Sequence, residues 1–381
     1  MKILAINWQD LTNPLSGGAE VHLGEILKRI AKEHQVTLFC SSYPDAKKIE
    51  IIDNMKIIRK GSRYNFNFTV LNSIKSLLAS EKPDLVVEDI NKIPFYTPLL
   101  HNLPTLVIVP HLFADSVFKE INFVLGLYIF LSEKPIPQVY KGGKFMVISE
   151  STKKDLMRRK IPAADITVIK CGIDHNLYKP NSRVEKEPTP LVVYVGRIKK
   201  YKSIEVLIKA FALVAKWFPQ AKLAIIGDGD FLPQLKNMAS ELKLKDRIEF
   251  TGFVPQKEKV RWYQRAWVAV CPSLKEGWGL TNIEANACGT CVVASDVPGL
   301  RDSVLNEKSG VLFEYGNEKK LAEILIKIIS DEKLRGKLSK GGLEWANSFS
   351  WDKAAEESLT LMEKILSEGS PAFGGGKEKC S

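Results

Sequence analysis

The stretch CPSLKEGWGLTNIEANACGTCVV, residues 271 to 293, decides the fold of this chain. The apolar residues 267 to 270 before it predict a strand, which is followed by a loop, a helix that contains Glu284 and, after Gly289, a second strand. This order is one strand–helix–strand unit of an open parallel sheet. Ligands of such sheets lie beyond the carboxyl ends of the strands, so the loop from Glu276 to Thr281 is predicted to face a ligand.

Two carboxylates in this stretch, Glu276 and Glu284, have seven residues between them. Gly279, Leu280 and Thr281 begin the predicted helix, where N–H groups without acceptors and the helix dipole favour an anion such as a diphosphate. The alternative is a solvated loop followed by a helix with an outward carboxylate. The stretch therefore indicates either an anion site or an ordinary loop, and the spacing by itself leaves both open.

The string EGWGLTNIEANACGT resembles the signature of the retaining nucleotide-sugar glycosyltransferases of glycosyltransferase family 4, in which Glu, seven residues and Glu precede a turn of small residues. The resemblance implies that Glu276 lies against the transferred sugar and that Glu284 binds the nucleotide ribose. It also implies that amides near Leu280 contact the diphosphate. The family usually has proline where this chain has Cys291, a departure that concerns the local turn.

Length and composition predict a globular protein of two domains. The chain has 381 residues, more than one core usually holds, with 45% hydrophobic and 26% charged residues. The formal net charge of +11 suits anionic ligands or an anionic lipid surface, although lysine-rich solvated helices give the same surplus. Six scattered cysteines fit a reducing cytosol, and the pair Cys288 and Cys291 is predicted to be structural because no second pair completes a zinc site.

The first half of the chain reads as alternating strands and helices. After an apolar strand from Lys2 to Asn7, Gly17 and Gly18 lead into a helix, which is a weak phosphate-binding signal that a flexible turn would also produce. The sequence GGAE resembles the N-terminal loop of the family, which implies that both glycines approach the donor diphosphate.

Polar residues also follow two later strands of this half. His111 follows the strand 105–109, and the family resemblance implies that it contacts the donor sugar, whereas an isolated histidine there is more often structural. Three residues at the end of the strand that begins at Leu85 are candidates either for a solvated cap or for acceptor contacts: Glu88, Asp89 and Asn91.

A second alternating run starts at Leu191. Arg197 and Lys202 follow its first strand, and they match the family's Arg and Lys that neutralise the leaving diphosphate, a task that fixed cations perform without a metal. The D-x-D formed by Asp228 and Asp230 is a metal-binding spacing in another transferase class, but here no metal and no cofactor are predicted. Gly227, after the next strand, is expected to keep its loop close to the nucleotide. The resemblance implies that the backbone at Gly252 and Val254, after the strand that follows, contacts the base.

The segment FVLGLYIFL, residues 123 to 131, is too short to cross a bilayer. It is predicted to be either a core helix or an interfacial helix that dips into an anionic membrane surface. With no secretory signal at the N-terminus, the expected location is cytoplasmic, with peripheral attachment to the inner face of the cell membrane if the second alternative holds.

These observations predict an α/β protein of two facing doubly wound Rossmann-like domains with a central cleft, the GT-B architecture. The domains are expected at 1–170, completed by a C-terminal helix at 351–366, and at 171–350, with an unstructured tail at 369–381. The predicted activity is a metal-independent, retaining sugar transfer from a nucleotide-sugar to a sugar or lipid-linked acceptor, without a nucleic-acid partner. A nucleotide-sugar epimerase and a non-catalytic nucleotide-sugar-binding module remain alternatives.

Overall fold

The computed structural model describes residues 1–91, 93–113, 117 and 123–369. It divides the chain into two compact units. Unit 1 comprises Met1–Gly172 with Trp351–Ser381, and unit 2 comprises Ile173–Ser350. The predicted division lay at Lys170. The predicted tail lies outside the described residues, apart from Gly369.

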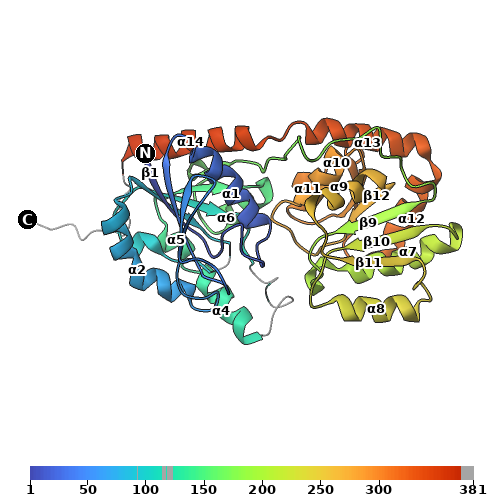
Figure 1. Ribbon diagram of the computed structural model, residues 1–381, viewed down its shortest axis with the longest axis horizontal. Coiled ribbons are helices and arrows are strands. Elements are labelled where there is room, and N and C mark those ends of the chain that lie inside the picture. Colours follow the sequence, from blue (N-terminus) through green and yellow to red (C-terminus); the bar gives the residue numbers. More distant parts are fainter. Residues whose placement is uncertain (92, 114–116, 118–122, 370–381) are drawn as a thin grey trace, which may run out of the picture. The chain divides into compact units, whose positions relative to one another are not determined.

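Unit 1 is an α/β layer structure around one eight-stranded sheet of order β3-β4-β2-β1-β5-β6-β7-β8 (Figure 1). Its strands are β1 Lys2–Ile6, β2 Gln35–Cys40, β3 Ile49–Ile52, β4 Met55–Arg59, β5 Leu85–Asp89, β6 Thr105–Val109, β7 Lys144–Val147 and β8 Ile166–Val168. Its helices are α1 Gly18–Ile30, α2 Phe66–Glu81, α4 Phe123–Glu133, α5 Ile136–Val139, α6 Glu150–Arg158 and α14 Trp351–Glu368. The central strands β1, β5 and β6 contain the buried apolar runs 3–6, 85–87 and 106–109, because helices cover both of their faces.

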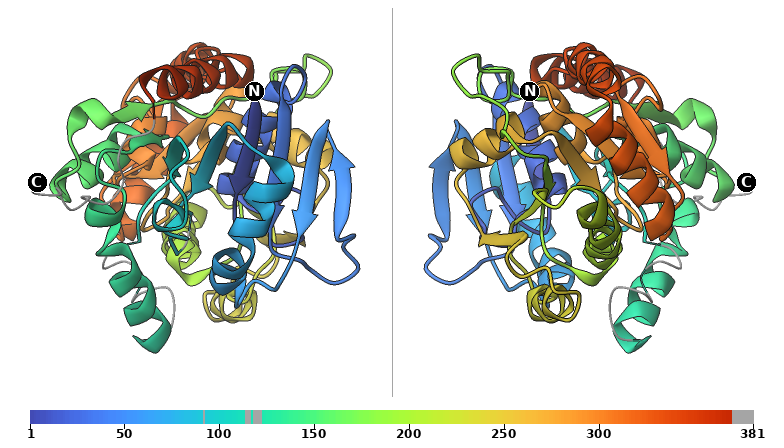
Figure 2. Two further views of the ribbon diagram at one scale, coloured as in Figure 1. Left: turned by 90° about the vertical axis from the view of Figure 1, so that its left-hand side faces the viewer. Right: turned by 90° about the vertical axis from the view of Figure 1, so that its right-hand side faces the viewer.

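One edge of this sheet carries a hairpin. β3 pairs with β4 antiparallel, whereas the other strand pairs of the sheet are parallel, and Figure 2 shows both strands at the sheet edge in blue. The turn between them consists of Asp53 and Asn54, which both adopt positive φ angles, 49° and 64°. Asp and Asn tolerate this conformation, which matches the twist of a two-residue hairpin.

Unit 2 is built around a six-stranded parallel sheet of order β11-β10-β9-β12-β13-β14. Its strands are β9 Leu191–Val195, β10 Lys222–Ile226, β11 Ile248–Gly252, β12 Val268–Cys271, β13 Cys291–Ser295 and β14 Gly310–Phe313. Its helices are α7 Ile204–Trp217, α8 Leu232–Glu241, α9 Gln256–Arg265, α10 Leu280–Ala287, α11 Leu300–Ser303, α12 Glu318–Ser330 and α13 Glu332–Ala346. α7 packs against α8 and α12, while α10 packs against α9 and α13, so helices cover both faces of the sheet (Figure 1).

The strand order shows why each unit can hold a ligand. In unit 2 the chain adds strands outward from β9 to β11 and then returns to the other side of β9 with β12, which is the doubly wound order with a switch point between β9 and β12. In unit 1 the same reversal lies between β1 and β5. Two doubly wound, Rossmann-like units confirm the predicted fold class.

The last helix, α14, belongs to unit 1 although it follows unit 2 in the sequence. It packs along α1, where Arg29 Nε donates to Asp352 Oδ1 over 2.6 Å and the rings of His22 and Trp351 lie 6.2 Å apart. The helix extends to Glu368, two residues beyond the predicted end. The apolar positions of α14 thus complete the first unit.

Candidate functional site

The candidate site of unit 2 lies at the carboxyl ends of β9 and β12, the two strands that border the switch point. The segment after β9 carries Arg197 and Lys202, and the segment after β12 carries Glu276. Arg197 is exposed, whereas Lys202 and Glu276 are partly buried, with side-chain exposures of 14% and 17%. The topology therefore brings these predicted residues to one edge of the sheet.

Glu276 is held by two donors on one oxygen. Lys202 Nζ and Ser273 Oγ both donate to Glu276 Oε1, the serine over 2.7 Å. Burial opposes the charge on Lys202, but the adjacent carboxylate outweighs it and raises the pKa of Lys202 above its ordinary value. Among the residues that the structure describes, no hydrogen bond to Glu276 Oε2 is found, so this oxygen can accept one from a ligand.

A glycine keeps the Glu276 loop close to the sheet. A Cβ atom on Gly299 would lie 2.0 Å from the carbonyl oxygen of Glu276, and Gly299 has a φ of 82°. Both the close approach and the backbone angle require glycine at this position. The loop that carries Glu276 is therefore fixed by backbone packing as well as by the Lys202 ion pair.

The helix that follows, α10, begins at the predicted residues. Gly279 precedes it with a φ of 92°, and Leu280 and Thr281 form its first turn. N–H groups in a first helical turn have no intrahelical acceptor, which suits an anion. The predicted diphosphate contact at Gly279, Leu280 and Thr281 remains a prediction.

Glu284 lies one turn further along α10 and has its own donors. Lys259 Nζ lies 2.8 Å from Glu284 Oε1, and Tyr263 OH donates to Oε2 over 3.1 Å. Tyr178 lies in the same environment: burial, followed by the charge of Glu284, raises the pKa of its hydroxyl. The Glu284 side chain is 12% exposed, so it is ordered and still reachable at its tip.

Three glycines meet at the carboxyl ends of β9, β10 and β11. Gly196 N donates to Ile226 O over 3.0 Å, and Gly227 N donates to Gly252 O over 2.9 Å. A Cβ on Gly227 would lie 2.0 Å from Gly196 O. This contact explains Gly227 by packing alone, while the predicted donor contacts of Gly227, Gly252 and Val254 remain predictions.

Unit 1 places the remaining candidates at the carboxyl edge of its own sheet. Gly17 N donates to Glu20 Oε2 over 2.7 Å, and Gly18 is the exposed first residue of α1. His111 follows β6 with its ring 4.9 Å from that of Phe113. The predicted donor contacts of the two glycines and of His111 are neither supported nor excluded by these contacts.

The loop before Gly17 is anchored by a buried ion pair. Arg59 Nε donates to Asp10 Oδ2 over 2.7 Å, and the two side chains are 0% and 3% exposed. Arg59 also donates to Thr12 Oγ1 and to Glu50 Oε2, each over 3.0 Å. The guanidinium therefore joins β4 to the loop that precedes α1.

The three acceptor candidates after β5 are buried. Glu88 is 0% exposed and accepts hydrogen bonds from Phe95 N at 2.7 Å, Thr97 N at 3.1 Å and Tyr140 OH. Asp89 is also 0% exposed, and Asn91 Nδ2 donates to Asn7 Oδ1 over 2.8 Å. Glu88 uses its carboxylate to bind backbone N–H groups of the loop that follows β5, and these contacts do not support the predicted acceptor contact.

Two sequence features predicted to be structural have structural contacts. Asp230 Oδ2 lies 2.7 Å from Lys199 Nζ, and Asp228 Oδ1 accepts from Gly229 N. Burial raises the pKa of Cys288 to about 12 and that of Cys291 to about 11, which disfavours the reactive thiolates. Within the described ranges, no group of three or more His, Cys, Asp and Glu side chains is arranged to hold a metal ion.

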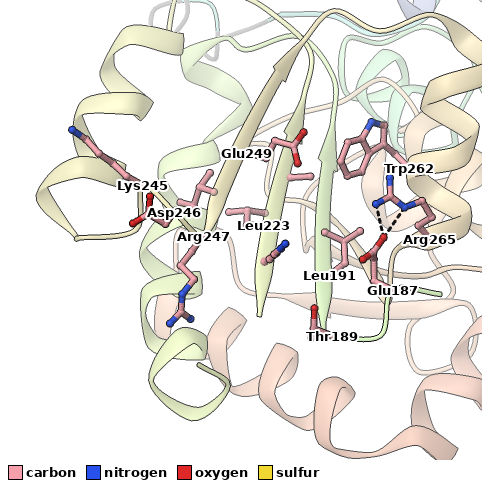
Figure 3. Close-up of a pocket in the computed structure, with 13 residues that line it drawn as sticks. Glu187, Thr189, Leu191, Leu223, Lys245, Asp246, Arg247, Glu249, Trp262 and Arg265 are labelled. Carbon is pink, nitrogen blue, oxygen red and sulfur yellow. Dashed lines mark hydrogen bonds and ion pairs between the residues drawn. The ribbon is translucent and has the colours of Figure 1, made fainter. Parts of the chain in front are cut away.

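A cavity of about 320 Å³ lies at the opposite edge of the unit 2 sheet. Figure 3 shows it at the amino ends of the strands, near Leu191 and Leu223, with Glu187 paired to Arg265 on one side. Parallel sheets bind their ligands at the carboxyl ends of the strands. The cavity is therefore distinct from the candidate site.

The sequence did not reveal three residues that donate to the two glutamates: Ser273, Lys259 and Tyr263. Ser273 follows directly on the end of β12, a position that could have drawn attention. The spacing of four between Lys259 and Tyr263 puts them on one face of α9, but no sequence signal directs that face toward Glu284.

Sequence comparison identifies the family. A sequence model described as Glycosyltransferase Family 4 matches residues 16–177, and one described as Glycosyl transferases group 1 matches residues 178–345. A D-inositol 3-phosphate glycosyltransferase of Thermomonospora curvata is 30% identical over 218 residues, which is 51% of this chain and 51% of that protein. Its counterpart in Corynebacterium glutamicum is 31% identical over 237 residues, 58% of this chain and 57% of that protein. The chain thus spans about half the length of these curated relatives.

Solved structures show the same fold. Sucrose-phosphate synthase from Thermosynechococcus elongatus has a TM-score of 0.83 at 22% identity, over 97% of this chain and 100% of that chain. Anabaena HepE in complex with UDP and glucose has a TM-score of 0.78 at 18% identity, over 96% and 100% of the two chains. These likenesses place both units in the GT-B fold class. The two family matches together span most of the sequence, and the chain belongs to glycosyltransferase family 4.

Proposed function

We propose that this protein is a retaining glycosyltransferase that transfers a sugar from a nucleoside-diphosphate sugar to an acceptor. The observation that carries the proposal is the Lys202–Glu276 pair at the switch point of unit 2, directly before the N-terminus of α10. A carboxylate with one accepting oxygen, a cation and helix amides are the groups that a sugar diphosphate needs. The complex of HepE with UDP and glucose, in a protein of the same fold, supports this donor class.

The proposed roles are those that the family resemblance implies for each residue. Glu276 orients the sugar and supports positive charge that develops on it, while Arg197 and Lys202 stabilise the departing diphosphate. Glu284 accepts a hydrogen bond from the ribose. His111 contacts the sugar, and the first turn of α10 binds the diphosphate. Because these cations supply the charge that a divalent ion provides elsewhere, the proposed transfer needs no metal.

The donor proposal is tested by thermal shift over UDP, GDP and ADP and their glucose, mannose and N-acetylglucosamine derivatives. A donor at a hundred times its Kd should add about 2.7 kcal/mol of stability. The stabilising donor is then incubated with candidate acceptors in the presence of EDTA, and the product anomer is read by NMR. Consumption of the donor without an acceptor would refute transfer to an acceptor. Loss of transfer with EDTA would refute metal independence, and a product of inverted anomeric configuration would refute retention.

A membrane surface is the proposed location of the acceptor, because α4 exposes apolar side chains. Phe123, Val124 and Leu125 of this helix are 70%, 75% and 52% exposed, and α4 projects from the rest of unit 1 (Figure 2). α2 continues the apolar surface, since Asn67 Nδ2 donates to Tyr128 OH over 2.7 Å and Phe68 is 57% exposed. Helices of this character lie at the boundary of head groups and acyl chains. In the part of the chain that the structure describes, each helix is too short or too polar to span a bilayer.

Cosedimentation with vesicles of phosphatidylglycerol and phosphatidylcholine tests the membrane proposal. The protein should bind vesicles whose content of anionic lipid matches that of the inner leaflet of a cell membrane. The double variant Phe123→Glu, Leu127→Glu should not bind them. Ile51→Glu serves as the control, because Ile51 is a 67% exposed apolar residue on the edge strand β3. Vesicle binding that is absent in the wild type, or equal in both variants, would contradict a lipid role for α4.

A further inference from the structure

Glu284 lies among side chains from two separate segments of unit 2. Lys259 and Tyr263 come from α9, four residues apart on one face, and reach different oxygens of the carboxylate at 2.8 Å and 3.1 Å. Tyr178 comes from the segment before β9; it is 5% exposed, and Lys259 Nζ lies 5.1 Å from the centre of its ring. The lysine is thus fixed between a carboxylate and an aromatic ring.

These contacts define how the carboxylate can act. A carboxylate accepts about four hydrogen bonds, and Lys259 and Tyr263 use two of them. Glu284 can therefore accept about two further hydrogen bonds, and its side chain is 12% exposed. This remaining acceptor capacity suits the hydroxyls of a ribose.

We propose that Lys259 and Tyr263 are positioning residues that hold the Glu284 carboxylate correctly oriented for the ribose of the nucleotide, an inference that rests on the proposed function. Because the two donors contact different oxygens of the carboxylate, they fix the rotation of its plane. Both act through Glu284 and neither needs to touch the donor. Their removal should therefore weaken recognition of the ribose hydroxyls and leave the other donor contacts unchanged.

The competing explanation is that Lys259 only ties α9 to α10. Both helices have buried apolar residues of their own, such as Val260 and Ile283, and an ion pair that is 20% and 12% exposed adds little to such packing. A purely structural role would change the affinity for every nucleotide equally. A positioning role changes the affinity only for nucleotides that have ribose hydroxyls.

The experiment measures binding of UDP, GDP and ADP and of their 2′,3′-dideoxy analogues by calorimetry, with the full chain and four variants. Wild type should prefer the ribonucleotide by about tenfold, the effect of one charge-assisted hydrogen bond. Lys259→Met and Tyr263→Phe should lose most of this preference while keeping the dideoxy affinity within about twofold. Lys259→Arg should restore part of it. Lys257→Met, an exposed lysine on the same helix, should behave as wild type.

The dideoxy affinity also reports whether each variant is folded. Equal weakening of both nucleotide forms in Lys259→Met and Tyr263→Phe, or a preserved ribose preference, would overturn the positioning role. Equal affinity of the wild type for ribonucleotides and dideoxynucleotides would also overturn the positioning role. In that case sugar transfer measured with the intact donor would still support the proposed function. If no nucleotide binds, the positioning role and the proposed function fall together.

Discussion

Acid should destabilise unit 1 through His22. This side chain of α1 is 0% exposed, and among the described residues neither ring nitrogen has a hydrogen-bond partner. Burial lowers the pKa of His22 from 6.5 to about 4, because a buried imidazolium loses its hydration. Below pH 6.5 the unfolded chain therefore takes up a proton that the folded chain does not.

The size of the effect follows from the two pKa values. At 1.36 kcal/mol for each pH unit, the difference between 6.5 and about 4 corresponds to about 3 kcal/mol of unfolding free energy. This stability is fully present above pH 6.5 and is lost as the pH falls toward 4. At pH 5 the loss amounts to about 2 kcal/mol relative to neutral pH.

Urea unfolding at pH 7.5 and at pH 5, followed by hydrogen exchange of peptides from α1 and α14, measures this loss in the unit that contains His22. His22→Phe keeps an aromatic ring beside Trp351 and removes the titrating group. The variant should lose about 2 kcal/mol less than wild type between the two pH values. His101, whose pKa burial also lowers to about 4, is present in both proteins and cancels in the comparison. If both proteins lose the same stability, His22 is not the buried neutral base inferred from its surroundings.

Three further substitutions test other parts of the structure. Arg59→Met should cost about 3 to 5 kcal/mol in chemical unfolding, because it leaves a buried carboxylate without its cation; a loss below about 1 kcal/mol would contradict this. Gly227→Ala should weaken donor binding and lower the melting temperature, because the added Cβ would lie 2.0 Å from the carbonyl oxygen of Gly196. The control Gly336→Ala should be tolerated, because no atom lies within 4 Å of the added Cβ. Lys202→Met should lower kcat by about a hundredfold, which corresponds to about 3 kcal/mol of transition-state stabilisation. The control Lys199→Met removes an exposed ion pair and should keep a kcat near that of the wild type. Equal kcat values in the two variants would refute the role of Lys202.

The order of strands and helices could be predicted because both sheets are mainly parallel. Strands buried on both faces appear as continuous apolar runs, and the glycines and polar residues that follow them mark the carboxyl ends where ligands bind. The loop that carries Glu276 was located in this way, and so were Arg197 and Lys202. The edge hairpin was not predicted, although Asp53 and Asn54 are residues typical of its turn.

Helix α13 shows why propensity can mislead. The segment contains glycines, which lower helix propensity by about 1 kcal/mol each, and no helix was predicted there. Gly341 and Gly342 are needed because α13 packs closely: a Cβ on Gly341 would lie 2.2 Å from Lys308 O, and one on Gly342 would lie 2.4 Å from Asn286 Oδ1. Tertiary packing thus overrides a local preference that a single sequence shows.

The electrostatics of the candidate site could not be predicted for a related reason. Each glutamate of the signature has its own lysine, and both lysines come from outside the signature: Lys202 from the segment after β9 and Lys259 from α9. The chain reaches these contacts only after β9 and β12 pair and α9 packs on α10. Since each pair is internally neutral, Lys202 must share its charge between Glu276 and any diphosphate that binds. Arg197 is exposed, so under the proposed function its loss should lower donor affinity more than it disturbs the structure of the site.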